Sequence, residues 1–442
     1  MRIAALFSLL VFLPSCANLH SQTASAEWST GFWFWPEAAA DIFPDPGPVD
    51  SLYVHVGTIN HNRWRSEDRW TAYIERPRDR PDARHYWAVF RTEEHEVPAA
   101  AAAEPLAEQL KQFEDYEGVQ LDIDVPTNQL RQYAAFLHEL RAQLPKGKQV
   151  SITALLDWFR AGTAIAEVVK EVDEFVPQFY DVGPSRDGAI AAKIDAAQWG
   201  PRFVRFGKPY RIGISAFGRV HFRERPQGLP NGAQHLARVA GFYNDLAPRG
   251  LATNPAFRLE VSRSPAQELV LAYQATKQIH IDWNSFQPGD EILFTIATAD
   301  TVRAGVAAAH KMPGCRGVLF FRWPSWSDAL VMQPDEVLAA AGVAPAADPK
   351  PRIATIDGRC AAVNCIDLYL IDPRPASPPA RRFKVKSSTE LEYFLPEKRV
   401  PVRMTGPSLI ELALPPYCGQ RRLYLGRAVS LKPATYSVEE FQ

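Results

Sequence analysis

The 442-residue chain has little cysteine, almost no net charge and no long apolar run beyond its first residues. A formal net charge of −1 argues against a protein that binds nucleic acid through bulk charge. The five cysteines form no C-x-x-C pair with nearby histidines, so we expect no metal site. No G-x-G-x-x-G follows the first expected strand, and no Ser-His-Asp order is evident. We therefore expect neither a dinucleotide nor any other cofactor.

Residues 1–26 are typical of an export signal, with Arg2 before a short apolar run, Ile3–Leu13. Two endings are open. Leu13-Pro14-Ser15-Cys16 resembles a bacterial lipobox, in which Cys16 would become the lipid anchor, although Pro14 departs from the usual small residue. Ala24-Ser25-Ala26 is a plain cleavage site that would discard Cys16. Both endings predict an exported protein, and the first predicts an envelope lipoprotein that meets the membrane only through its lipid.

Strand-like apolar or aromatic runs alternate with helical patterns along most of the mature chain. The strand-like runs are Gly31–Trp35, Leu52–Val56, Tyr86–Phe90, Val119–Asp124, Val150–Leu155, Phe175–Tyr180, Tyr210–Phe217 and Gly317–Trp323. The helical patterns cover 99–113, 128–144, 164–172, 189–199 and 300–310. This alternation predicts an α/β fold, a (β/α)₈ TIM barrel, with an open doubly wound sheet as the alternative.

Two further regions do not belong to the simple barrel pattern. Residues 257–297 contain strand-like runs around a Gln287-Pro288-Gly289-Asp290 turn, which predicts a β-rich insertion before the last barrel strand. The Pro- and Ala-rich stretch 345–351 is typical of a linker, and the short strands of 352–442 predict a small β-sandwich domain. The predicted barrel domain is then 27–344. A disulfide among Cys360, Cys365 and Cys418 fits an exported protein, and its connectivity is open.

The run Val119–Asp124 carries the strongest functional signal. Its apolar and polar residues alternate, which places Gln120, Asp122 and Asp124 on one side of the strand. In a parallel sheet covered on both faces, that polar side faces an interior, where two carboxylates are costly to ionise. These acids therefore indicate a functional site.

Active sites of TIM barrels lie at the C-terminal ends of the strands. At these ends the chain has acids surrounded by aromatic residues, an arrangement suited to a glycan, because carboxylates act on glycosidic oxygens and aromatic faces stack on sugars. We predict a catalytic group of Asp124, Asp122, Asp181 and Tyr180. The predicted substrate-binding group comprises Trp323, Trp158, Asp157, Gln178 and Trp35, while Trp33 and His55 are weaker candidates.

A resemblance to family 18 chitinases accompanies these residues. Glu117–Asp124 resembles their fourth-strand motif D-x-x-D-x-D-x-E, Gln178–Asp181 is similar to their sixth-strand M-x-Y-D, and Trp323 falls where their eighth-strand Trp lies under the sugar. Here Glu117 and Gln120 replace two aspartates of the motif, and Asp124 replaces the catalytic glutamate.

The resemblance implies a role for each residue of the catalytic group. Asp124 would be the general acid, Asp122 would orient the N-acetyl group of the sugar, and Tyr180 and Asp181 would be partners of that group. Because Asp is one methylene shorter than Glu, the Asp124 carboxyl is expected to lie farther from the glycosidic oxygen than the glutamate of the motif, and such a displacement lowers the rate of hydrolysis.

A second resemblance covers nearly the whole mature chain. Several stretches resemble a family of exported bacterial proteins known as a domain of unknown function: VQLDID-x-P-T-x-x-L, SITALLDW, PQFYDVG, RGVLFFRWPSW and LPPYCGQRRLYLGRA. We therefore expect a glycoside-hydrolase-like envelope protein that acts on or binds a glycan, with an N-acetylhexosamine as the sugar that the first resemblance implies. The alternatives are a non-catalytic glycan-binding lipoprotein and a structural envelope protein.

Overall fold

The computed structural model describes residues 28–42, 49–62, 69–92, 96–182, 188–223, 251–281, 284–345, 350–360, 364–372, 374, 379–398, 400–416 and 421–441. The predicted export signal with Cys16, and also Cys418, lie outside the described residues.

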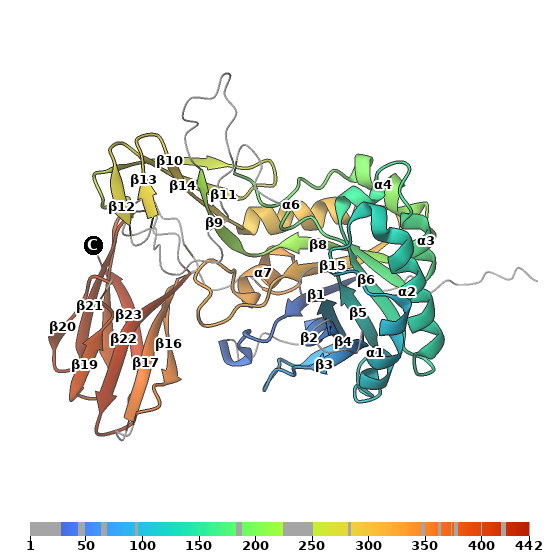
Figure 1. Ribbon diagram of the computed structural model, residues 1–442. Helices are drawn as coiled ribbons and strands as arrows, with labels where there is room; N and C mark the ends of the chain where they lie inside the picture. Colours follow the sequence, from blue (N-terminus) through green and yellow to red (C-terminus); the bar gives the residue numbers. More distant parts are fainter. Residues whose placement is uncertain are drawn as a thin grey trace, which may run out of the picture.

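The first sheet has nine strands, of which all but β3 (Arg69–Ile74) are parallel and close into a barrel. The order around the barrel is β1-β15-β8-β7-β6-β5-β4-β2, and the pairing of β1 with β2 closes it (Figure 1). The bounds are β1 (Ser29–Phe34), β2 (Val49–Asn62), β4 (Ala83–Thr92), β5 (Gly118–Asp122), β6 (Gln149–Ala154), β7 (Glu174–Pro177), β8 (Tyr210–Ser215) and β15 (Cys315–Phe321). The predicted TIM barrel is confirmed, since the closing pair excludes an open sheet.

Helices cover the outside of the barrel. They are α1 (Ala103–Leu110), α2 (Leu130–Gln143), α3 (Ile165–Lys170), α4 (Ala196–Val204), α6 (Ala299–Ala309) and α7 (Pro334–Ala340), with short 3₁₀ turns η1 (Ala40–Ile42), η3 (Ala100–Ala102), η4 (Thr127–Gln129) and η5 (Leu156–Phe159). The helix predicted from residue 189 begins only at Ala196. The Asp195 carboxylate caps it by accepting hydrogen bonds from the backbone N–H groups of Ala197 and Gln198, which fixes that start.

The two faces of the barrel strands bury different side chains. Val119 and Leu121 of β5 point outward into the large apolar core beneath the helices. A second apolar cluster fills the inside of the barrel, with residues contributed by most of its strands: Trp33, Tyr53, Trp87, Val89, Val176, Tyr180 and Leu319. The alternation predicted for β5 therefore holds, and its polar residues share the interior with this aromatic cluster.

An antiparallel sheet interrupts the barrel between β8 and β15, as predicted. Its order is β10-β11-β14-β9, and a two-stranded β12-β13 ribbon accompanies it. The bounds are β9 (Gly218–Arg223), β10 (Phe257–Arg263), β11 (Leu269–Ala275), β12 (Ile279–Ile281), β13 (Asn284–Phe286) and β14 (Glu291–Ile296). Because β9 follows β8 after two residues, this insertion stands at the C-terminal ends of the barrel strands.

The C-terminal part forms two antiparallel sheets of four strands, with orders β16-β17-β22-β19 and β20-β21-β18-β23. The bounds are β16 (Arg352–Asp357), β17 (Asn364–Ile371), β18 (Arg381–Ser387), β19 (Tyr393–Pro396), β20 (Val402–Gly406), β21 (Leu409–Leu414), β22 (Arg422–Ser430) and β23 (Tyr436–Phe441). Side chains of both sheets meet in one apolar cluster, as in a sandwich. The disulfide joins Cys360 to Cys365.

Arg421 fastens the C-terminal sheets to the barrel. Its side chain is 1% exposed and pairs with Glu336 of α7, with Nε 2.9 Å from Oε2. The Arg421 guanidinium also donates to the Ala297 carbonyl oxygen at 2.9 Å, and the Arg421 backbone N–H donates to the Ala329 carbonyl oxygen at 2.7 Å.

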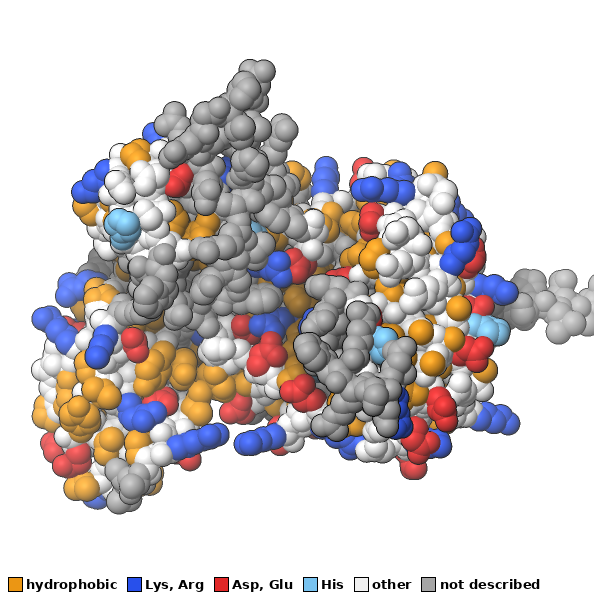
Figure 2. Space-filling view, in the orientation of Figure 1, with side chains coloured by type: hydrophobic (Ala, Val, Ile, Leu, Met, Phe, Trp, Pro, Cys, Tyr) orange, Lys and Arg blue, Asp and Glu red, His pale blue; other side chains and the backbone are white. Residues whose placement is uncertain are grey.

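Acidic and basic side chains are interspersed over the face shown in Figure 2. No helix of the described part is long and apolar enough to cross a membrane.

Candidate functional site at the C-terminal end of the barrel

A group of mutually bonded polar side chains lies in the barrel interior, below the C-terminal ends of the strands; Glu174, for example, is the first residue of β7. We call it the lower polar layer: Trp33, Tyr53, Gln120, Ser151, Glu174 and Arg211. The Trp33 indole N–H donates to Gln120 Oε1 at 2.6 Å, and Gln120 Nε2 donates to Ser151 Oγ at 3.1 Å. Ser151 Oγ donates in turn to Glu174 Oε1 at 3.3 Å. Gln120, which replaces an acid of the chitinase motif, therefore serves as a neutral bridge.

Glu174 is the anchor of this lower polar layer. The Tyr53 hydroxyl donates to Glu174 Oε1 at 2.7 Å, and Arg211 Nε lies 3.3 Å from Glu174 Oε2. The Glu174 carboxylate thus has a largely buried cation and two hydroxyl donors as partners. These interactions compensate for the hydration that the carboxylate loses on burial.

Asp122 lies one inward position further along β5, among the upper side chains of the barrel. Its Oδ1 accepts hydrogen bonds from Thr153 Oγ1 at 2.9 Å and from Gln178 Nε2 at 3.3 Å. Burial, and then the charge of Asp124, raise the pKa of Asp122 to about 6, against the Thr153 hydrogen bond and the Arg91 charge, which lower it. Asp122 can therefore change its protonation state close to neutral pH.

The structure brings the predicted catalytic group together. Asp124 follows the end of β5 and is exposed. Its charge acts on the pKa of Asp122, Tyr180 and Asp181 alike, as expected of carboxyl and hydroxyl groups that share one site.

Tyr180 is fixed by aromatic packing. Its ring stacks on Phe321 with centroids 4.5 Å apart and meets the edge of Trp33 at 5.2 Å. Burial, followed by the charges of Asp122 and Asp124, raises the pKa of its hydroxyl well above the usual range. The Tyr180 hydroxyl is therefore a neutral hydrogen-bond donor at any physiological pH.

Asp181 is held by the insertion. Its carboxylate forms an ion pair with Arg219 of β9. Burial raises the pKa of Asp181 and the Arg219 charge opposes this effect. Asp181 also has φ of 52°, in the left-handed region that non-glycine residues seldom adopt, and such backbone is common at functional sites.

Two tryptophans predicted to bind substrate lie instead in the core. Trp323 and Trp158 are both 0% exposed. The Trp323 indole N–H donates to the Ala39 carbonyl oxygen at 3.0 Å, and that of Trp158 donates to the Val125 carbonyl oxygen at 2.8 Å. The place expected for Trp323 beside Tyr180 is taken by Phe321, the last residue of β15.

The other predicted binding residues have separate surroundings. Gln178 is bonded to Asp122, as described above. Asp157 lies in the turn η5 and accepts a hydrogen bond from Thr127 Oγ1 at 2.9 Å; within the described part none links it to the catalytic group. Trp35 lies near the site, with its ring 6.1 Å from that of Phe321.

Sequence reasoning missed Arg91 and underrated His55. Arg91 pairs in register with Asp122 and has its guanidinium 5.7 Å from the centroid of the Trp35 ring. His55 is 3% exposed, and neither of its ring nitrogens has a hydrogen-bond partner within the described structure. Burial, and then the Arg91 charge, lower the pKa of His55 to about 4, so the ring is neutral at pH 7. The period-two pattern of the third strand, continued past Phe90, would have identified Arg91.

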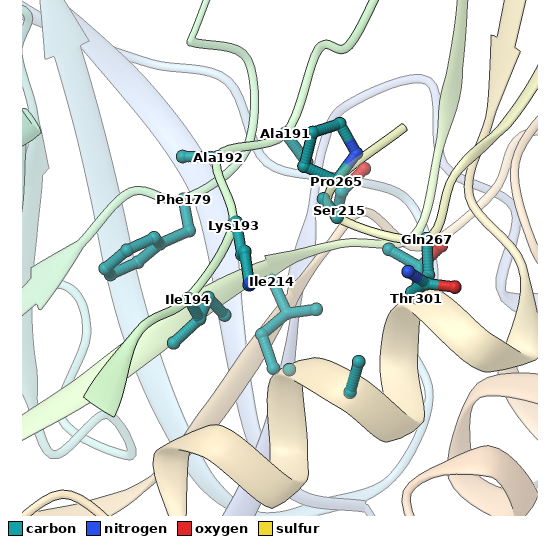
Figure 3. A pocket seen from close by; sticks show the side chains of 13 residues that line it. Phe179, Ala191, Ala192, Lys193, Ile194, Ile214, Ser215, Pro265, Gln267 and Thr301 are labelled. Atoms are coloured by element: carbon teal, nitrogen blue, oxygen red, sulfur yellow. The ribbon is translucent and has the colours of Figure 1, made fainter. Parts of the chain in front are cut away.

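A cavity of about 220 Å³ lies between the segment that precedes α4 and the first turns of α6, beside the C-terminal end of β8, which belongs to the barrel mouth (Figure 3). None of the predicted catalytic acids lines it. It is enclosed by the end of β8, the first turns of α6 and the turn between β10 and β11, and Lys193, Ser215 and Gln267 are among the few polar residues of its mainly apolar lining. In the described ranges, no three His, Cys, Asp or Glu side chains gather as a candidate metal site.

Comparison with known proteins finds one family model that matches part of the chain. Residues 89–228, from β4 to past β9, match the family described as Domain of unknown function (DUF3142). No curated protein matches the sequence.

Several solved structures are similar to the chain at low identity. The spore cortex-lytic enzyme SleL of Bacillus cereus is 12% identical with a TM-score of 0.46, over 73% of this chain and 75% of that one. Chitinase ChiA74 of Bacillus thuringiensis is 10% identical with a TM-score of 0.46, over 93% and 100%. The GH18 chitinase ChiB of Flavobacterium johnsoniae is 9% identical with a TM-score of 0.40, over 72% and 93%. At these values the similarity assigns neither a substrate nor a reaction, which have to come from the residues of the site.

Proposed function

We propose that this protein is a glycoside-hydrolase-like enzyme that cleaves a glycan at the C-terminal end of its barrel. The observation that carries the proposal is the pair formed by Asp122, the last residue of β5, and the exposed Asp124 that follows it, with the pKa of Asp122 raised to about 6. Two neighbouring carboxyl groups of unlike surroundings are the usual requirement for acid catalysis on a glycosidic oxygen.

Asp124 is the group proposed to donate the proton. It follows the strand end and reaches solvent, so a glycosidic oxygen can approach it. As the bond between the anomeric carbon and the glycosidic oxygen breaks, Asp124 gives its proton to that oxygen. A water molecule then bonds to the anomeric carbon of the other sugar and gives one proton to the Asp124 carboxylate, which restores the acid. Asp122, which Thr153 and Gln178 hold in place, and the Tyr180 hydroxyl would orient the sugar, with an N-acetyl substituent as the group that best suits a carboxyl beside a phenol.

Asp124→Asn tests this assignment. Loss of the acid should lower the rate of glycan hydrolysis about 100- to 10,000-fold while the melting temperature stays near that of the wild type. Asp195→Asn is the matched control, because Asn caps a helix as well as Asp and residue 195 caps α4. Full activity in Asp124→Asn would refute the role of Asp124.

A second candidate is a glycan-binding protein that does not cleave its ligand. The shorter side chain of Asp124, in place of glutamate, favours it. Asp124→Glu separates the two candidates. Hydrolysis gained only in that variant, with glycan binding in both forms, would identify a binding protein.

We also propose that the chain is exported and anchored in the cell envelope through Cys16. The support is the sequence pattern of residues 1–26 alone. Metabolic labelling with a fatty acid should mark the wild type and leave Cys16→Ser unlabelled. Absence of label from both would refute the anchor.

A further inference from the structure

One side of the barrel mouth presents a cation, Arg91, that has no acidic partner among the described residues. Arg91 lies near the end of β4, and its side chain is exposed. Within the described part of the chain no hydrogen bond or ion pair occupies its guanidinium, which lies over the Trp35 ring of β1. Two further arginines near the strand ends are already engaged, Arg219 with Asp181 and Arg322 with Glu37 and Asp328.

Asp122, the acid opposite Arg91 on the neighbouring strand, forms its hydrogen bonds on the other side. Arg91 and Asp122 are register partners on adjacent strands, so their side chains start on the same face. Asp122 nevertheless places its Oδ1 toward Thr153 of β6 and Gln178, which follows β7, on the side opposite to β4. The two charges influence each other without forming a contact pair.

The floor under Arg91 is aromatic and neutral. Trp35 is 7% exposed, and its ring centroid lies 5.0 Å from that of His55 on β2. Trp35 Nε1 and both His55 nitrogens have no hydrogen-bond partner in the described residues. Both rings are uncharged at pH 7, because the pKa of His55 is lowered to about 4, so neither balances the charge of the guanidinium. An exposed guanidinium above an indole offers a rigid fork of donors, which matches the two oxygens of a carboxylate, while the aromatic ring suits an apolar sugar face.

We propose that Arg91 and Trp35 form a subsite for a carboxylate-bearing sugar, so that the glycan bound by this protein is acidic. The inference rests on the proposed glycan function and deepens it. The site then has an acidic side and a cationic side. Asp122 and Asp124 face the bond to be cleaved, and Arg91 binds the carboxylate of the sugar. A neutral chitin-like chain would leave Arg91 without a partner.

Matched glycans test the proposal. The full-length protein is titrated with uronic-acid and N-acetylmuramic-acid oligosaccharides and with their methyl esters, which differ only in the charge of the carboxyl group. The wild type should bind the acids more tightly than the esters, and Arg91→Gln should weaken binding of the acids about 10- to 100-fold while changing the esters by no more than about twofold. Arg91→Lys should keep part of the preference, because it retains the charge and loses the fork.

The controls separate the possible failures. Arg131→Gln removes an exposed arginine of α2 that forms an ion pair with Glu167 of α3, and this variant should behave as the wild type. Equal affinity of the wild type for acids and esters would overturn the acidic-sugar inference alone, as would a loss of both in Arg91→Gln. Equal binding of sulfated glycans would replace the carboxylate by a general anion site. If no glycan of either form binds, the proposed glycan function itself fails.

Discussion

The lower polar layer and the mouth above it are built on the same strands and treat their polar groups in opposite ways. In the lower polar layer, Glu174 has a cation and two hydroxyl donors, and Gln120 uses both ends of its amide. At the mouth, Asp122 has a pKa raised to about 6, and His55 has no hydrogen-bond partner within the described structure. Ser215 Oγ is buried and has no such partner there either.

This difference indicates that the lower polar layer supports the fold and that the mouth serves the function. A buried polar group without a partner costs about 1–3 kcal/mol, so a fold retains it only where something else compensates. In the lower polar layer, Arg211 Nε is the one described side-chain atom without a hydrogen bond, and its ion pair with Glu174 compensates for this. This layer can therefore act as the rigid base of the mouth. The mouth carries the cost, which is the expected property of a surface that is completed by a ligand.

The largest effect should come from breaking the lower polar layer. Glu174→Ala leaves the buried Arg211 without its carboxylate, and we expect the free energy of unfolding to fall by about 3–5 kcal/mol. Urea denaturation measures it. A loss below about 1 kcal/mol would mean that the ion pair is not the anchor we describe.

At the mouth we expect a smaller change in the free energy of unfolding, and here the substitution should stabilise the protein. The pKa of Asp122 is raised from 3.8 to about 6 by folding, so the folded state keeps its proton longer than the unfolded chain and stability falls as pH rises through this window. Asp122→Asn cannot ionise and should be more stable than the wild type by about 1–2 kcal/mol above about pH 7, with little gain below about pH 4. Denaturation at both pH values checks this, and a gain that does not depend on pH would contradict it.

The finest comparison uses two buried serines of the barrel. Ser151 joins Gln120 to Glu174, so Ser151→Ala should cost about 1 kcal/mol. Ser215 Oγ has no partner among the described residues, so Ser215→Ala should cost nothing or stabilise by up to about 1 kcal/mol. Equal losses in both variants would show that pairing does not distinguish the layers.

The sequence was sufficient to predict the barrel and the inward position of Asp122 on β5. Each barrel strand is an apolar run, and the period-two alternation of Val119–Asp124 is maintained in the structure, so the inward position of Asp122 followed directly.

The errors occur where strands end. β15 ends at Phe321, and the alternation no longer applies to Trp323, which turned into the core. Trp158 lies in the turn η5, where strand periodicity gives no direction. β4 extends to Thr92, two residues beyond the predicted run, and this extension hid Arg91. The periodicity of the sequence predicts strands and helices well. It does not predict their last residues, because these depend on contacts between distant segments.

Arg421 has a consequence for where the chain can be divided. Residues 345–351 have the composition of a linker, yet Arg421 reaches back from the C-terminal sheets to Glu336 and to the Ala297 carbonyl oxygen. A barrel truncated at residue 344 would lose this guanidinium and leave its partners exposed. We therefore expect the two separated halves to be less soluble, and to unfold less cooperatively, than the intact chain. The reason is that the contacts of Arg421, and not the linker alone, hold the C-terminal sheets against the barrel.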